Sequence, residues 1–306
     1  MNVLIIGGSG YLGGRIAHHL SDAGKRVYQG VRSSFIEPRS KSCNRFLPID
    51  LFSEDSLIKS FEGFDVIIHA AGPNSQECVK NPEKARAFSS ICTKNICRAA
   101  VKASIKKLIF LSTVHVYSSP LIGSINENQP LLNDHPYAIS NALGEKAILE
   151  LIGTSTKPVV LRLTNCFGRP IQPKAKCWML FVNDICKAAI NEHSIEIKDN
   201  PNLKRNFMPI SYLNKVIECF LEKKNNYSIY NVGWEESLSL KMMANRVQEE
   251  CYKILNFRPK LRYLSAQTPS NQLVINIDRL ISEFDGEPKY FDEELQKLLI
   301  YCNEKK

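Results

Sequence analysis

A glycine-rich segment close to the N-terminus has the spacing of a phosphate-binding loop. It reads Gly7-Gly8-Ser9-Gly10-Tyr11-Leu12-Gly13, after an apolar stretch and before a stretch with helical periodicity. Gly7 would permit a tight turn, Gly10 would let the backbone approach a pyrophosphate, and Gly13 would let helix and strand pack closely. The helix N-terminus would then face the phosphates. The alternative is a glycine-rich connector without a ligand. We expect a dinucleotide to contact Gly7, Gly10, Tyr11, Leu12 and Gly13.

The end of the next apolar stretch, residues 26–31, indicates which dinucleotide would bind. An NAD site usually offers a carboxylate to the adenosine ribose at this point. Here the sequence is Gly30-Val31-Arg32-Ser33-Ser34, which has no acidic residue. Arg32 can pair with a 2′-phosphate, and Ser33 or Ser34 can form a hydrogen bond with it. NADP(H) is therefore expected in preference to NAD(H), unless Arg32 is an ordinary surface arginine.

The elements that must position this loop alternate regularly between strand and helix patterns. The expected strands are residues 2–6, 26–31, 45–49, 65–69, 107–112 and 158–163. The expected helices are residues 11–23, 53–61, 85–103, 135–151 and 180–191. Strands that are apolar on both faces and alternate with helices are typical of a parallel sheet covered on both sides. The expected fold class is α/β, a Rossmann doubly wound parallel sheet with a smaller, mixed C-terminal lobe.

The pattern becomes irregular beyond Asn165, where Gly168, Pro170 and Pro173 indicate a loop. We expect residues 1–166 to form the dinucleotide-binding domain. Residues 167–306 should form mostly a substrate-binding lobe. Segments near residues 206–235, including an apolar stretch at 227–232, are expected to return to the main sheet.

Composition excludes several classes of protein. The net charge is +9, but the lysines and arginines are scattered, so nucleic-acid binding is not expected. Apolar runs are far shorter than the roughly 20 residues that span a bilayer, and no signal peptide is evident, so we expect no membrane partner and a cytoplasmic location. The ten cysteines form no Cys-x-x-Cys pair, so neither a metal site nor disulfides are expected.

Further motifs follow the successive strands. They are Asp50-Leu51, His69-Ala70-Ala71-Gly72, Leu111-Ser112-Thr113-Val114-His115-Val116-Tyr117, Pro136-Tyr137-Ala138-Ile139-Ser140 and Leu161-Arg162-Leu163-Thr164-Asn165-Cys166-Phe167-Gly168. With the glycine loop, they make nearly the whole chain resemble the extended short-chain dehydrogenase/reductase family. Its relevant branch contains nucleotide-sugar epimerases, dehydratases and ketoreductases. The resemblance implies that Asp50 and Leu51 contact adenine, and that Ala70, Ala71 and Gly72 line the cofactor.

The resemblance also implies a catalytic group. Tyr137 matches the family tyrosine that exchanges a proton with a sugar oxygen while hydride moves to or from the nicotinamide. Thr113 matches the hydroxyl that steadies the same oxygen. The family has lysine four residues after the tyrosine, and this chain has Asn141. Asn141 can still hydrogen-bond a ribose hydroxyl, but it brings no charge to stabilise a tyrosinate. Tyr137 is therefore expected to act as a neutral proton donor, which favours ketone reduction.

His115 and Val114 occupy the positions where the family's dehydratases carry two adjacent acidic residues. The groups for water elimination are therefore missing. His115 would instead assist the proton relay or contact substrate, because the pKa of histidine lies near neutrality. The alternative is a histidine packed against the end of the sheet.

The resemblance further implies a substrate side. Asn165 matches a residue that touches the sugar or diphosphate, and Leu163 would lie beside the nicotinamide. Asn183 and Arg205 match positions that hold the nucleotide base and the diphosphate. Trp178 would wall the pocket, although packing is an equal alternative. By analogy with the family, a homodimer would pair the helices expected at residues 85–103 and 135–151.

The function expected from these residues is NADPH-dependent reduction of a nucleotide-linked 4-keto sugar for polysaccharide or glycan precursor synthesis. One alternative is a C4 epimerase of nucleotide sugars that holds NAD tightly. The other is a non-catalytic NADP(H)-binding sensor or scaffold, in which Asn141 marks an abandoned active site. The nucleotide base and the sugar stay open.

Overall fold

The computed structural model describes residues 1–34, 45–266, 268–284, 286 and 290–306. Its centre is a seven-stranded parallel sheet in the order β3-β2-β1-β4-β5-β7-β11. The strands are β1 (Asn2–Ile6), β2 (Arg26–Val31), β3 (Arg45–Pro48), β4 (Val66–His69), β5 (Lys107–Thr113), β7 (Lys157–Leu163) and β11 (Ile229–Val232). β1 pairs with both β2 and β4, so the strand order reverses beside it. In such sheets a ligand binds outside the carboxyl ends of the strands at this reversal.

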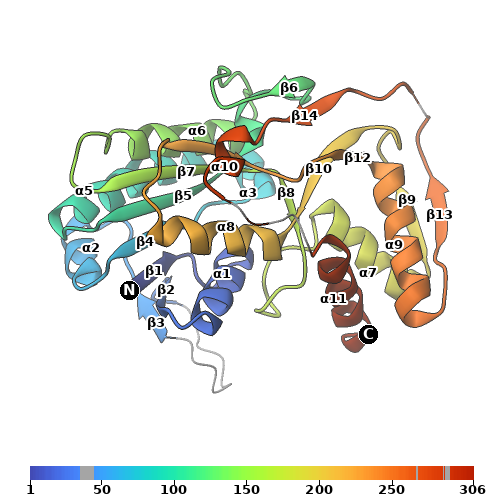
Figure 1. Ribbon diagram of the computed structural model, residues 1–306, viewed down its shortest axis with the longest axis horizontal. Coiled ribbons are helices and arrows are strands. Elements are labelled where there is room, and N and C mark those ends of the chain that lie inside the picture. The colour runs from blue at the N-terminus through green and yellow to red at the C-terminus, as the bar shows by residue number, and fades with distance from the viewer. Residues whose placement is uncertain (35–44, 267, 285, 287–289) are drawn as a thin grey trace.

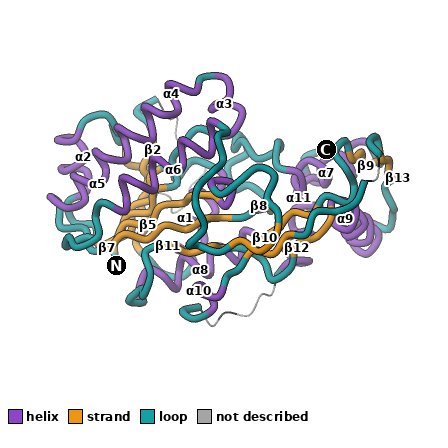
Figure 2. The backbone as a smooth tube through the Cα atoms, turned by 90° about the horizontal axis from the view of Figure 1, so that it is seen from above, coloured by secondary structure: helices purple, strands orange, loops and turns teal. Residues whose placement is uncertain are grey.

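Helices cover both faces of the sheet (Figures 1 and 2). One face carries α1 (Tyr11–Asp22) and α8 (Ile210–Glu222); the other carries α2 (Glu54–Phe61), α5 (Thr93–Lys102) and α6 (Pro136–Leu149). Alternate side chains of β1 explain the two layers. Val3 and Ile5 join the first core, and Leu4 and Ile6 join the second. The predicted α/β class, with a parallel sheet covered by helices on both faces, is confirmed.

The second half of the chain builds most of the smaller units. A three-stranded sheet contains β8 (Asn165–Phe167), β10 (Lys204–Pro209) and β12 (Ser237–Ser239). Two pairs of parallel strands are β9 (Ser194–Ile197) with β13 (Lys260–Tyr263), and β6 (Gly123–Ile125) with β14 (Leu273–Ile275). α7 (Phe181–Glu192), α9 (Leu240–Leu255), α10 (Asp278–Ile281) and α11 (Phe291–Glu304) complete the chain. The units that contain α7, α9, α11, β9 and β13 lie on the right of Figure 1. As expected, one later segment returns to the main sheet, because β11 pairs with β7.

One predicted element is interrupted. The helix expected at residues 85–103 consists of α4 (Pro82–Ala87), a π-helical turn at Phe88–Cys92, and α5. A short helix that the sequence did not predict, α3 (Ser75–Lys80), precedes it with a capping box between Asn74 and Glu77. In the part of the chain that the structure describes, no helix is long and apolar enough to cross a membrane. The described cysteines are all free, and most are buried.

Candidate active site

The glycine loop lies at the carboxyl end of β1, where the strand order reverses. Gly7 has a φ of +87°, and its N–H donates to the Gly30 carbonyl at 3.0 Å. A Cβ on Gly13 would lie 2.3 Å from the Gly7 carbonyl oxygen, so the turn and the start of α1 fit together only through glycine. Gly10 is exposed and precedes the first residue of α1. The backbone is thus shaped for a close approach from solvent at Gly10.

The N-terminus of α1 is suited to an anion. Among the described residues, no side chain caps it, and its first turn contains no acidic residue. The N–H groups of Tyr11, Leu12 and Gly13 have no partner within the helix, and they add to the positive end of the helix dipole. The Tyr11 side chain itself turns away, because its hydroxyl donates to the Gly168 carbonyl at 2.9 Å. A pyrophosphate therefore fits the backbone here, and Tyr11 would contribute only its N–H.

The ends of neighbouring strands surround the loop. Arg32, Ser33 and Ser34 follow β2 and are exposed. The Asp50 carboxylate accepts the Phe52 N–H at 3.0 Å and is exposed after β3, and Leu51 is partly buried beside it. Ala70, Ala71 and Gly72 follow β4, and a Cβ on Gly7 would lie 2.8 Å from the Ala71 nitrogen. The structure thus gathers all these predicted cofactor residues at one edge of the sheet.

A carboxylate that sequence reasoning missed also lies near Arg32. Glu77 on α3 forms a 2.6 Å ion pair with Lys176. The hydrogen bond from Lys176, followed by smaller effects that include Arg32, lowers the pKa of Glu77. Arg32 is 45 residues before Glu77, and Lys176 is 99 residues after it, so no local pattern connects the three. Any 2′-phosphate bound by Arg32 would be close to this acid.

Tyr137, Thr113 and Asn141 lie together. Tyr137 is the second residue of α6, and Thr113 is the last residue of β5. Burial, with a smaller effect of Cys78, raises the pKa of Tyr137 to about 12, although contacts from the Asn141 and Thr113 side chains lower it. The Asn141 amide also donates to the Tyr137 carbonyl at 2.8 Å. The arrangement keeps the Tyr137 hydroxyl neutral at physiological pH, which suits a proton donor.

Local structure fixes the start of α6. Pro136 occupies the first turn, where its missing N–H costs nothing, and His135 accepts the Tyr137 N–H through Nδ1 at 3.2 Å. The Asn133 side chain donates to the His115 carbonyl at 2.6 Å. His135 and Asn133 therefore hold the segment that carries Tyr137. Sequence reasoning missed both as site residues, and only the Pro136 signal for a helix start lay nearby.

His115 lies close to this group. Its N–H donates to the Thr113 hydroxyl at 3.2 Å. Burial lowers the pKa of His115, whereas a hydrogen bond with Asn165 raises it, and Arg205 and His135 lower it further. The imidazole is thus neutral at pH 7 and lies close to Asn165 and Arg205. These three predicted residues come from three separate segments, and the fold brings them together.

Arg205 and Asn165 are each partly engaged. The Arg205 guanidinium forms a 3.0 Å ion pair with Asp199 and lies 5.9 Å from the centre of the Phe181 ring. The Asn165 amide donates to the Asn206 carbonyl at 2.9 Å. About a third of the Arg205 side chain is exposed, so it can still meet an anionic ligand. Leu163 is buried at the end of β7.

Two predicted substrate residues have other partners. Asn183 is fully buried, and its amide both donates to the Gly168 carbonyl and accepts the Gly168 N–H, at 3.0 and 3.2 Å. Its side chain has no free edge for a nucleotide base, which corrects the sequence-based expectation. Trp178 stacks on Tyr301 with ring centres 6.3 Å apart, and Lys187 lies over its ring. These contacts favour the packing alternative for Trp178.

Among the described residues, no group of side chains is arranged to hold a metal ion. His69, at the end of β4, is buried, and burial lowers its pKa to about 4. The groups at this site that can exchange a proton include the Tyr137 phenol and the His115 imidazole. The site combines an anion-binding loop with a neutral phenol and a neutral imidazole.

Comparisons with known proteins agree with this geometry. The sequence model described as the NAD dependent epimerase/dehydratase family matches residues 3–233. A putative UDP-glucose 4-epimerase of Methanocaldococcus jannaschii is 27% identical over 81% of this chain and 82% of its own length. The dTDP-4-dehydro-6-deoxyglucose reductase of Escherichia coli is 24% identical over 73% and 67%. The structure of the UDP-glucose 4-epimerase of Thermotoga maritima with UDP-glucose superposes with a TM-score of 0.82 at 18% identity, covering 100% and 99% of the two chains.

Proposed function

Because the chain belongs to the NAD-dependent epimerase/dehydratase family, we propose that it is an NADPH-dependent reductase of a nucleotide-linked 4-keto sugar. Its membership makes it an NAD(P)-dependent enzyme of the extended short-chain dehydrogenase/reductase type. The observation that carries the proposal is the neutral surrounding of Tyr137, whose pKa of about 12 suits a donor. The E. coli relative, named as a reductase of a dTDP-linked 4-keto sugar, supports the same direction.

The residues of this chain have distinct roles in the proposed step. The dinucleotide, when bound, supplies hydride from nicotinamide C4 to the carbonyl carbon of the sugar. Tyr137 donates its phenolic proton to the carbonyl oxygen, and the Thr113 hydroxyl hydrogen-bonds the same oxygen. Asn141 orients the nicotinamide ribose, and the tyrosinate left after the step is reprotonated from solvent, with His115 as a relay. NADPH is oxidised, and the ketone becomes an alcohol.

The binding roles follow the same layout. The glycine loop and the N–H groups of α1 hold the pyrophosphate. Arg32 binds the 2′-phosphate. Because Glu77 lies nearby, the phosphate must compete with this carboxylate for the Arg32 guanidinium. Residues 1–166 bind the dinucleotide, and residues 167–306 mostly bind the nucleotide sugar, with Asn165 and Arg205 facing its diphosphate. By analogy with the family, the proposal includes a homodimer that pairs the helical segments at residues 85–103 and 135–151.

The test measures NADPH absorbance with dTDP-linked and UDP-linked 4-keto sugars. One NADPH should be oxidised for each sugar reduced. Tyr137→Phe should abolish turnover and leave the dissociation constant of NADPH within about twofold, since the phenol contributes to the reaction more than to binding. If the protein binds NADPH but shows no turnover that requires Tyr137, the reductase proposal is wrong. The alternative of a non-catalytic sensor or scaffold then remains.

A C4 epimerase is the second candidate, because the M. jannaschii relative bears that name. This activity requires Tyr137 to act as a base in its oxidative step, which Asn141 does not assist. An epimerase should retain NAD through purification and interconvert the C4 epimers without net consumption of NADPH. Extraction of the cofactor from the purified protein, followed by chromatography, distinguishes the two candidates.

A further inference from the structure

A buried ion pair lies behind the proposed catalytic group. Glu145 on α6 and Arg162 on β7 form a bidentate contact, with Arg162 Nη2 2.7 Å from Glu145 Oε2 and Nε 3.1 Å from both oxygens. The two side chains are 2% and 4% exposed. The Ser112 hydroxyl on β5 also donates to Glu145 Oε1. One carboxylate thus joins α6 to β5 and β7.

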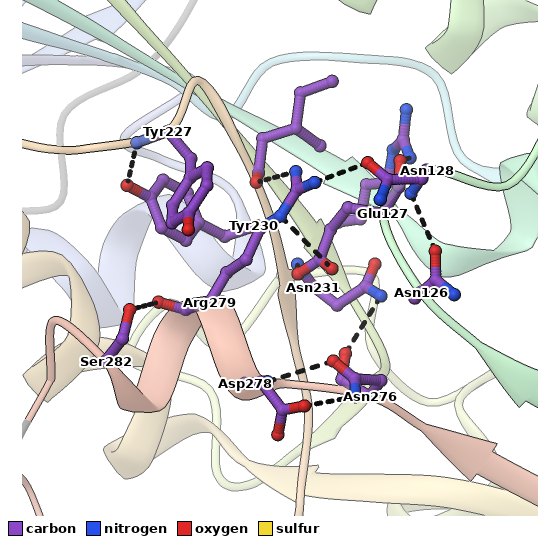
Figure 3. Close-up of polar contacts among 12 residues, drawn as sticks. Asn126, Glu127, Asn128, Tyr227, Tyr230, Asn231, Asn276, Asp278, Arg279 and Ser282 are labelled. Atoms are coloured by element: carbon purple, nitrogen blue, oxygen red, sulfur yellow. Dashed lines mark hydrogen bonds and ion pairs between the residues drawn. The ribbon is translucent and has the colours of Figure 1, made fainter.

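The pair continues into a larger polar network. Arg162 Nη1 donates to the Tyr117 hydroxyl at 2.8 Å, and its guanidinium lies 4.8 Å from the centre of the Tyr117 ring. The Tyr117 hydroxyl donates to the Asn231 side chain at 2.6 Å, and the Asn231 N–H donates to Glu127 at 2.9 Å. Glu127 in turn lies 3.8 Å from Arg279 on α10 (Figure 3). The network therefore reaches from the middle of α6 to the edge strand β11.

The location of the pair relates it to the active site. Ser112 directly precedes Thr113 in β5, and Arg162 directly precedes Leu163 in β7. Glu145 is two helical turns beyond Tyr137, and Asn141 lies halfway between them on the same face. The helix that carries Tyr137 and the two strands that carry Thr113 and Leu163 are therefore joined through this one ion pair and its contact with Ser112.

Stability alone does not explain a buried pair of this kind. Removing two charges from water is costly, and uncharged side chains of similar volume often give equal or greater stability. A bidentate contact does, however, fix the distance and the rotation of one element relative to another. Proton and hydride transfer depend on such placement, since an error of about 1 Å can cost about a hundredfold in rate.

We propose that Glu145 and Arg162 are positioning residues, which hold Tyr137 on α6 in register with Thr113 on β5. This inference rests on the proposed reaction for its kinetic consequence. The placement of Tyr137 relative to its surroundings is a property of the protein that can be measured without turnover.

The main variant replaces both charges, with Glu145→Gln and Arg162→Met together. Glutamine can keep the Ser112 hydrogen bond, and no charge is left unpaired, so the double variant should have a melting temperature close to that of the wild type. The single variant Glu145→Gln leaves Arg162 buried without a counter-charge, and its melting temperature should fall. The comparison separates the stability of the fold from the placement of α6.

Glu283→Gln provides the matched control. The Glu283 carboxylate is also buried, and it accepts the Tyr230 hydroxyl at 2.6 Å and the Asn226 N–H at 2.8 Å. It lies near Lys107, the first residue of β5, whereas Thr113 is the last. This variant removes a buried charge that lies near the same sheet, at the end away from Tyr137.

Two measurements follow. In protein labelled with [13Cζ]tyrosine, the Tyr137 resonance is assigned from its loss in Tyr137→Phe. A pKa of about 12 leaves about 3% of Tyr137 ionised at pH 10.5, compared with about 75% for a solvated tyrosine. In the double variant the ionised fraction should rise severalfold, and in Glu283→Gln it should stay at the wild-type value. The kcat for the keto sugar should fall by about tenfold to a hundredfold in the double variant, with the NADPH dissociation constant within about twofold.

An unchanged ionised fraction of Tyr137 in the double variant would overturn the positioning proposal, whatever the rates. Recovery of both the melting temperature and kcat in the double variant would also overturn it, because the pair would then serve stability alone. If the wild-type protein turns over no 4-keto sugar, the proposed reaction fails, and the resonance of Tyr137 still decides the positioning role.

Discussion

The charge at position 141 should determine the pH range in which the enzyme works. Asn141→Lys places a cation one helical turn from Tyr137 on the face that already touches its side chain. Burial raises the pKa of Tyr137 to about 12, and the neutral Asn141 amide only partly opposes this. A cation within about 4–6 Å typically lowers such a pKa by about 1 to 3. The lysine should therefore move the loss of the phenolic proton to between roughly pH 9 and pH 11.

The effect on the reductive rate can be worked out from the neutral fraction of Tyr137. At pH 10.5 a pKa of about 12 leaves about 97% of the phenol neutral, so the wild-type kcat should stay level from pH 7 to pH 10.5. A pKa lower by about 2 leaves about a quarter neutral, and kcat should fall about fourfold over the same range. Near neutrality the rates of reduction and of oxidation should change together, because a substitution in the enzyme does not alter the equilibrium constant of the reaction. The position of the bend in the pH profile is thus the informative quantity.

The assay follows NADPH oxidation at saturating keto sugar between pH 7 and pH 10.5, with melting temperatures at each pH to confirm that the protein is folded. Asn141→Met is the matched control, since methionine approaches the length of lysine without its charge. Its profile should stay level like that of the wild type. A wild-type rate that already falls below pH 10 would refute a neutral, well-buried Tyr137. Identical profiles for the lysine and methionine variants would refute an electrostatic role for position 141.

Three further outcomes are expected. Arg32→Asp should weaken NADPH binding by roughly tenfold to a hundredfold, because a charge-assisted contact is lost, and it should strengthen NADH binding. The control Arg26→Asp, at the other end of β2, should change neither dissociation constant by more than about twofold. Equal effects of Arg32→Asp on both cofactors would exclude a 2′-phosphate site. Gly13→Ala puts a Cβ 2.3 Å from the Gly7 carbonyl oxygen, so it should lower both the melting temperature and the affinity for NADPH. In Gly10→Ala the nearest contact of the new Cβ is 3.1 Å, so this variant should lower the affinity for NADPH more than the melting temperature. His69, with a pKa lowered to about 4 by burial, binds fewer protons when folded than when unfolded, so its contribution to stability is present above pH 6.5 and is lost as the pH falls toward 4. His69→Phe should therefore reduce the loss of unfolding free energy between pH 7 and pH 4.5 by about 2 kcal/mol, measured by urea titration at the two pH values, and an unchanged difference would contradict this.

The sequence predicted the main sheet well because its strands are short, apolar on both faces and separated by helices with clear periodicity. The glycine loop could be located from the sequence because Gly7 and Gly13 have no room for a larger side chain. The sequence predicted a single helix at residues 85–103 because helical periodicity does not distinguish a π-helical turn from an α-helical one. The helices α9 and α11 lie beyond Asn165, where strands and helices no longer alternate regularly, and neither was predicted.

The candidate site was less accessible to sequence reasoning, because it depends on contacts between distant segments. Asn183 matched a binding position by its place in the chain, yet the fold turns its amide onto Gly168, 15 residues earlier. The Glu77–Lys176 ion pair near Arg32 joins residues that are 99 positions apart. Periodicity and motifs report which elements form, but they do not report which side chains of separate elements meet.

The cations near the active site also explain why Tyr137 remains neutral. Arg162 is the basic residue most deeply embedded behind the catalytic group, and its charge is matched by Glu145. Arg205 lies near His115 and pairs with Asp199. The strongest influences on Tyr137 are burial, two thiols and two uncharged hydrogen-bonding side chains. A tyrosine in such surroundings keeps its proton until a reacting oxygen needs it, because neither of these paired cations replaces the charge of the family lysine.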